Sequence, residues 1–165
     1  MRILGGFILA LMLSSNLFAI DNHAIYVSPG FSISWNLEGN LSFSPKISFG
    51  YYQDQTFTNL TVGYSPMNKG TLTSFWFVEG QVGHLSDPME FRKLQLFSGA
   101  GLGINIHPQE DFRISYRASL FSGFGIFAKA SFIYKDRLIP DLGAEAVMPL
   151  PLNNVVEIGS PGGGE

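Results

Sequence analysis

Hydrophobic residues alternate with small or polar residues along most of this 165-residue chain. From Lys93 to Ile106, Leu, Ala and Ile occupy most even-numbered positions, while Lys93, Gln95, three glycines and Asn105 occupy odd-numbered ones. A period of two places these two sets on opposite faces of a β-strand. About thirteen residues tilted at about 45° rise roughly 30 Å, about the thickness of a bilayer's hydrocarbon core. The pattern therefore predicts a membrane-spanning strand.

The same alternation recurs in seven other segments, which polar or glycine-containing turns separate. Together they predict an all-β fold, an eight-stranded antiparallel up-and-down transmembrane β-barrel with a polar interior. Phe57 is out of phase with its segment, which suggests a bulge or a strand start. The predicted strands are residues 24–37, 41–52, 56–64, 71–85, 93–106, 112–120, 124–134 and 138–150.

The two ends of the chain differ from this pattern. Arg2 is followed by an apolar run over residues 3–13 and then by small and polar residues, which is typical of an export signal cleaved near Ala19. We therefore expect a signal peptide at 1–19, a barrel domain at 20–150 and a flexible tail at 151–165.

The amino-acid composition excludes several classes of protein. Charged residues are 14% of the chain, against about 25% in ordinary soluble domains, so a soluble barrel could not cover its outer face with charge. The net charge of −3 argues against a nucleic-acid partner. The chain has no Cys, and His23, His84 and His107 are scattered, so we expect neither a metal site nor a cofactor.

Charge segregates by face. Nine charged residues fall inside or directly beside the predicted strands. Only Arg92, next to the start of the strand at 93–106, lies on the apolar side, where a long side chain near a strand end can snorkel. A cation facing lipid near the midplane would cost about 2–4 kcal/mol, so polar residues belong in the interior. There they must pair, which predicts a structural plug of ion pairs, with a proton path, a narrow pore or an inner binding site as alternatives. The interior cluster is Lys46, Glu79, Lys93, Arg113, Arg117, Lys129, Asp141 and Glu145.

The signal, the eight alternating segments and the aromatic residues on their apolar faces resemble the small outer-membrane β-barrels of Gram-negative-type bacteria, over about residues 24–150. The aromatic residues are Trp35, Tyr51, Tyr64, Trp76 and Tyr134. The resemblance implies a bacterial outer-membrane location, contact with membrane lipid, insertion by the outer-membrane assembly machinery and a non-catalytic structural or envelope role. The chain departs from that class in its short connections, in its Met148-Pro149-Leu150 ending, and in Pro29, Pro45 and Pro140 within predicted strands.

Two other functions remain open. A soluble periplasmic or secreted barrel, similar to lipocalins, would turn the apolar face inward around an apolar ligand. A lipid-modifying enzyme would use His84 and Ser86, a pair similar to the His-x-Ser pairing of outer-membrane lipid A deacylases, although the predicted strand end lies on the periplasmic side.

The glycines at 99, 101 and 103 invite comparison with a nucleotide-binding loop, but a strand rather than a helix follows them. We expect them to lie on the inner face and make room for bulky neighbours such as Phe75, Phe77 or arginine side chains.

Overall fold

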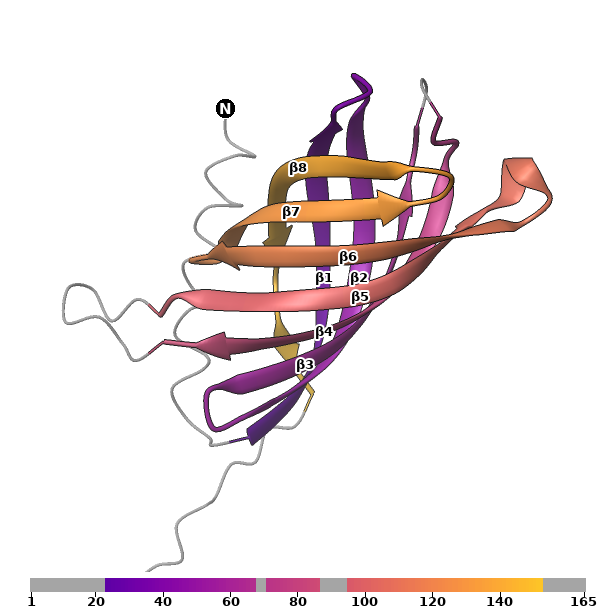
Figure 1. Cartoon of the computed structure of the whole chain (residues 1–165). Coiled ribbons are helices and arrows are strands. Elements are labelled where there is room, and N and C mark those ends of the chain that lie inside the picture. The colour runs from indigo at the N-terminus through magenta and orange to yellow at the C-terminus, as the bar shows by residue number, and fades with distance from the viewer. Residues whose placement is uncertain (1–22, 68–70, 87–94, 153–165) are drawn as a thin grey trace, which may run out of the picture.

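The computed structural model describes residues 23–67, 71–86 and 95–152. Within these ranges the chain forms eight long strands, one short strand and a single 3₁₀ turn (Figure 1). None of the described residues forms a helix with the length and apolarity needed to cross a membrane. The elements are β1 (His23–Asn36), β2 (Leu41–Gln53), β3 (Thr56–Ser65), β4 (Phe75–Leu85), β5 (Phe97–His107), η2 (Pro108–Glu110), β6 (Arg113–Gly123), β7 (Ile126–Tyr134), β8 (Leu138–Val147) and β9 (Leu150–Pro151).

The strands close into a barrel. Each of β1–β8 pairs antiparallel with its neighbours in sequence, and β1 pairs with both β2 and β8, so these eight strands leave no open edge. The short β9 continues β8 along the same side of β1. The predicted fold class, an eight-stranded antiparallel up-and-down barrel, is confirmed.

The register fixes how steeply the strands tilt. A path that starts at His23 of β1 and follows paired residues from strand to strand around the barrel returns to β1 at Ile33, ten residues beyond its start. The residues between them on this path are Gln53, Thr56, His84, Ser98, Ser122, Ala128 and Ala144. With about 3.3 Å per residue and about 4.8 Å between strands, this offset gives a tilt of about 40°. The eleven residues of β4 then rise about 27 Å, close to the roughly 25 Å apolar band of outer-membrane barrels.

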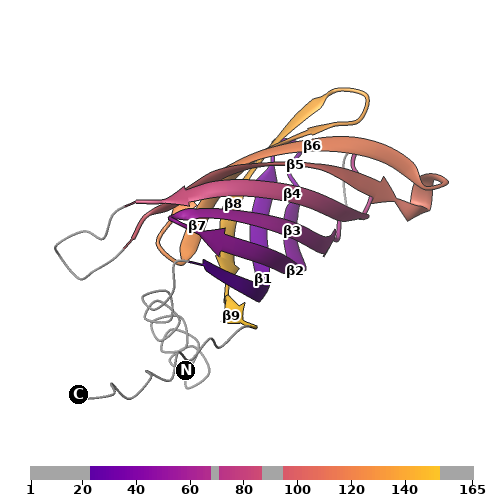
Figure 2. The same cartoon turned by 90° about the horizontal axis from the view of Figure 1, so that it is seen from below.

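The tilt is visible in the two views of the molecule. In Figure 1, strands β5–β7 on the near wall cross β1 and β2 on the far wall at a steep angle, and Figure 2 shows the same walls from below. We call the end where β1 begins and β9 ends the terminal mouth. The other end, with the β1–β2, β3–β4, β5–β6 and β7–β8 connections, is the distal mouth.

Several predicted strand ends were wrong by a few residues. The fourth strand begins at Phe75 rather than at residue 71, and the fifth at Phe97, with residues 93 and 94 outside the described ranges. The sixth strand continues to Gly123, because the turn is made by the next two residues, with Gly125 at φ +82°. The eighth breaks after Val147 and resumes as β9, so Pro151 lies in a strand rather than in the predicted tail.

The three prolines that the sequence placed within long strands are tolerated because each lies where one of its strand's two ladders stops. The Pro29 carbonyl accepts a bond from the amide of Met148, at the break between β8 and β9. Pro45 lies one residue beyond the end of the β2–β3 ladder, and Pro140 one residue beyond the end of the β8–β1 ladder. A proline has no N–H to donate, so these positions keep the loss of ladder bonds small.

Aromatic side chains in the interior lie across glycines on neighbouring strands. A Cβ atom built on Gly83 would lie 2.2 Å from Cζ of Phe57, its cross-strand partner, and one built on Gly99 would lie 2.6 Å from Cζ of Phe121. The same relation joins Phe77 to Gly63 and Tyr26 to Gly50. Phe57 is thus in phase with the inner face, and the suggestion of a bulge there was wrong.

The outer wall is apolar, as the alternation predicts. Leu102 is 73% exposed and Ile126 is 59% exposed, although both are large hydrophobic residues. Amphipathic aromatic residues gather on the outer face near the distal mouth, the position they take at a membrane–water interface. They are Trp35, Tyr64, Trp76, Tyr116 and Tyr134, and the Tyr64 and Trp76 rings lie 5.0 Å apart. The apolar outer wall and polar interior are those of a membrane-type barrel.

Candidate functional site

The interior is built in three layers. An apolar cluster near the distal mouth consists of Met67, Leu72, Phe75, Phe77, Ile133 and Ile139. An aromatic cluster near the terminal mouth consists of Phe57, Leu85, Phe121 and Phe127, with Tyr52, Phe97 and Val147 packed against it. Charged and hydroxyl side chains fill the space between them, and most are buried. Charged side chains thus lie between the two clusters, while buried neutral polar side chains such as Ser42, Ser65 and His107 also lie beside the distal cluster, at strand ends.

Six buried side chains in the middle layer form one alternating chain of charges, which we call the ion chain. Its order is Lys46, Glu145, Lys129, Glu79, Arg117 and Asp141, supplied by strands β2, β4, β6, β7 and β8. Three cations and three anions alternate, so the formal charges cancel within the chain. This balance meets the requirement that buried charges be paired.

Glu79 is the centre of the ion chain. Its side chain is fully buried, with Oε1 3.1 Å from Nζ of Lys129 and Oε2 3.3 Å from Nε of Arg117. The Ser119 hydroxyl and the Gln81 side-chain amide also donate hydrogen bonds to Oε1, at 2.6 and 2.8 Å. The carboxylate thus has two cations and two neutral donors, which compensate for its loss of water.

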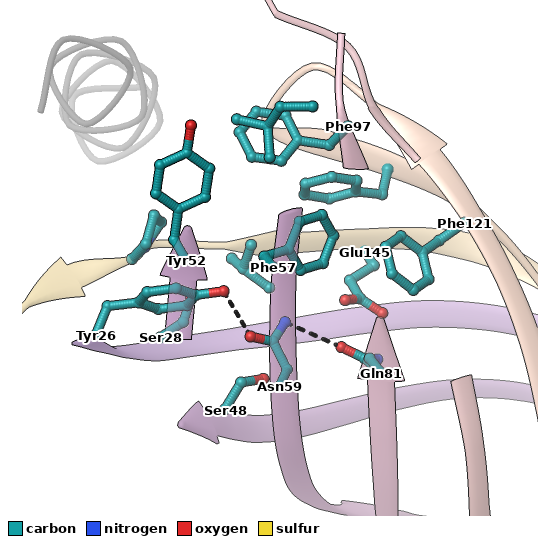
Figure 3. A pocket seen from close by; sticks show the side chains of 14 residues that line it. Tyr26, Ser28, Ser48, Tyr52, Phe57, Asn59, Gln81, Phe97, Phe121 and Glu145 are labelled. Atoms are coloured by element: carbon teal, nitrogen blue, oxygen red, sulfur yellow. Dashed lines mark hydrogen bonds between the residues drawn. The ribbon is translucent and has the colours of Figure 1, made fainter. Parts of the chain in front are cut away.

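The two sides of the ion chain are held in different ways. The Arg117 guanidinium lies over the Phe77 ring, 4.7 Å from its centroid, so the chain touches the distal apolar cluster through a cation–π contact. Towards the terminal mouth, a line of hydrogen bonds leads from the Tyr26 hydroxyl to Asn59, then to Gln81 and Glu79. Figure 3 shows the first two of these bonds.

The structure brings six of the eight candidate interior residues together in the ion chain. Arg113 was wrongly expected inside: it is exposed at the distal mouth and pairs with Asp136. Arg113 is the first residue of β6, where the ladder ends and a long side chain can reach water. Lys93 lies outside the described residues.

A second polar cluster at the distal mouth could not be predicted from the alternation. Glu38 accepts hydrogen bonds from the amide and the hydroxyl of Thr71, both at 2.7 Å, and pairs with Arg137. These contacts tie together three of the four distal connections. The fourth joins through Glu110 of η2, which pairs with Lys135.

The pKa values of both acids reflect these contacts. Partial burial alone would raise the pKa of Glu38, but the hydrogen bonds from Arg137 and Thr71 outweigh it and lower the pKa below its ordinary value of 4.5. Hydrogen bonds from Lys135 and Thr73 lower the pKa of Glu110 in the same way. Both carboxylates are therefore held in the charged form at the distal mouth.

The other residues that the sequence singled out lie outside the ion chain. His84 is exposed on the outer side of β4, and the Ser86 hydroxyl accepts a bond from the amide of Leu96 at 3.0 Å. Among the described residues no group of three or more His, Asp or Glu side chains could hold a metal ion. Of the inner-face glycines, Gly101 makes room for Glu79, so Phe75 and Phe77 were the wrong neighbours.

No protein-family model and no curated protein matches the sequence. One solved structure, described as "De novo design of transmembrane beta-barrels", is similar over 74% of this chain and 94% of its own, with 10% sequence identity and a TM-score of 0.45. The closed strand pairing and its register define the fold.

Proposed function

We propose that this protein is a non-catalytic outer-membrane β-barrel with a structural or envelope role, whose interior is closed by the ion chain. The observation that carries this proposal is the layering of the interior. A charge-balanced polar layer lies between two apolar clusters, inside a wall whose outer face is apolar. An eight-stranded barrel has room inside for side chains but not for a wide channel.

The interior supports a role as a plug rather than as a pore. A conducting path needs an open polar route to both mouths, and the distal cluster fills part of that end with buried apolar side chains such as Leu72, Phe75 and Ile139. A lipocalin-like role needs an apolar interior, and here the apolar positions of β5 and β7, such as Leu102 and Ile126, lie outside. The layered interior therefore favours the structural role.

The location and the partners belong to the same proposal. The expected signal peptide at 1–19, which lies outside the described residues, favours export, and the apolar wall favours contact with membrane lipid. An outer-membrane barrel also needs the outer-membrane assembly machinery for insertion. We propose no cofactor.

Fractionation of cells that produce the chain tests the location. The protein should remain in the membrane fraction after salt and urea washes, dissolve in detergent, and migrate differently on a detergent gel before and after heating. Recovery in the soluble fraction would contradict the proposal.

Two further assays test the role. In planar bilayers the purified barrel should give no steady conductance, and regular ohmic channels would favour a pore instead. Lipid A from cells that produce the wild type or Ser86→Ala should have the same acylation as lipid A from cells without the protein. A difference that depends on Ser86 would favour the lipid-modifying enzyme.

A further inference from the structure

A small cavity lies beneath the aromatic cluster of the terminal mouth. Its volume is about 50 Å³, far below the roughly 300–1,000 Å³ of ordinary ligand pockets, so only a small molecule or the end of a larger one would fit. The walls are mainly apolar and come from the aromatic cluster, as Figure 3 shows for Phe57, Phe97 and Phe121. The ion chain reaches this cavity only through Glu145.

The polar side of the cavity has an unused hydrogen-bonding group. The Ser28 side chain lines the cavity and is only 3% exposed, yet its hydroxyl has no hydrogen-bond partner among the described residues. Buried polar groups are rarely left unpaired, because such a group loses its hydrogen bonds to water and gains none in return. Its neighbours Tyr26, Asn59 and Gln81 are already bonded to one another. Ser28 is thus available to a ligand.

The charge of such a ligand follows from the ion chain. Glu145 already pairs with Lys46 and Lys129, and the six charges of the chain cancel. A cationic or anionic head group in the cavity would therefore be an uncompensated buried charge, which is strongly unfavourable.

We propose that the terminal mouth is a binding site for small neutral amphiphiles, molecules with a short apolar body and one hydroxyl or amide group. The apolar body contacts the aromatic cluster, and the polar group hydrogen-bonds to Ser28. This inference does not depend on the structural role proposed above, because it concerns only the interior of the folded barrel.

Three probes of nearly equal size test the proposal on the unaltered full chain in detergent micelles. They are 1-propanol, which is neutral, and propylamine and propionate, which are charged at pH 7. Amide chemical shifts are measured by NMR during titration. Propanol should shift the amides of Ser28 and Phe57 in a saturable way and leave Ser44, on the distal side, unchanged. Equal shifts at the two sites, a linear response, or equal binding of the charged probes would overturn the proposal.

A second test uses the absence of cysteine from the chain. Ser28→Cys places a single thiol in the cavity, and Ser44→Cys is a matched control, since Ser44 is also 3% exposed but bonded to Ser65. Methyl methanethiosulfonate, a small neutral reagent, should modify the first thiol at least about tenfold faster, because thiol reactivity follows access. Propanol should slow only that reaction. Equal rates, or no protection by propanol, would contradict the proposal.

Discussion

Removing the charge of Glu79, at the centre of the ion chain, should strongly destabilise the barrel. Glu79→Gln keeps the size of the side chain but leaves three buried cations facing two anions. Breaking a buried pair in this way costs about 3–5 kcal/mol, a large fraction of a typical stability of about 5–15 kcal/mol. Because Glu79 pairs with both Lys129 and Arg117, both cations lose a partner.

The order of residues in the ion chain predicts which second substitution restores the stability lost in Glu79→Gln. Glu79→Gln combined with Lys129→Met leaves two complete pairs, Lys46 with Glu145 and Arg117 with Asp141. Replacing a buried pair by apolar groups is often nearly neutral, so this double variant should recover most of the lost stability. Glu79→Gln combined with Arg117→Met leaves Asp141 without its cation and should recover little.

Urea unfolding in lipid vesicles measures these differences. Fluorescence of Trp35 and Trp76 reports unfolding, because both tryptophans lie on the outer wall. Heat-modifiable migration on a detergent gel shows whether each variant folds at all. A cost below about 1 kcal/mol for Glu79→Gln, or equal stability of the two double variants, would refute the pairing described here.

Two further predictions use other parts of the barrel. Gly83→Ala should destabilise the fold by about 1–3 kcal/mol, because its Cβ would lie 2.2 Å from Phe57. Gly80→Ala on the same strand should be nearly neutral, because its Cβ would have only one neighbour, at 3.9 Å. Urea unfolding compares the two variants, and equal stability would contradict the packing of Phe57 on Gly83. The contacts of Glu38 should be complete above its ordinary pKa of 4.5 and be lost as the pH falls through its lowered pKa. The NMR shift of the Thr71 amide should therefore titrate below pH 4.5 in the wild type, and this transition should be absent in Glu38→Gln. A Thr71 midpoint above 4.5 would contradict the lowered pKa.

The alternation of side chains predicted the features that depend on a period of two. Along β2, every residue from Ser42 to Gly50 lies on the face that its parity assigns, because a strand has only two faces. Lys46 and Glu79 could be placed inside for the same reason. Their partners could not be named, because pairing depends on the register between strands, which the pattern along one strand does not contain.

The mouths of the barrel were less predictable. Arg113 has the parity of an inner residue, but it lies at the end of its strand, where the inner face meets water. The Glu38 contacts join connections that lie 33 and 99 residues apart in the sequence, and no local pattern indicates them. Phe57 looked out of phase because an aromatic residue on the polar face is explained only by Gly83 on the next strand.

The membrane assignment depends on contact between the apolar outer wall and lipid. Trp35 and Trp76 are the only tryptophans, and both lie on that wall, so no variant is needed to test it. The measurement is the fluorescence of the wild-type chain in vesicles made with phospholipids brominated near the glycerol end of their acyl chains. Strong quenching relative to unbrominated vesicles is the predicted result. Unchanged fluorescence, with the protein left in solution when the vesicles are sedimented, would contradict it.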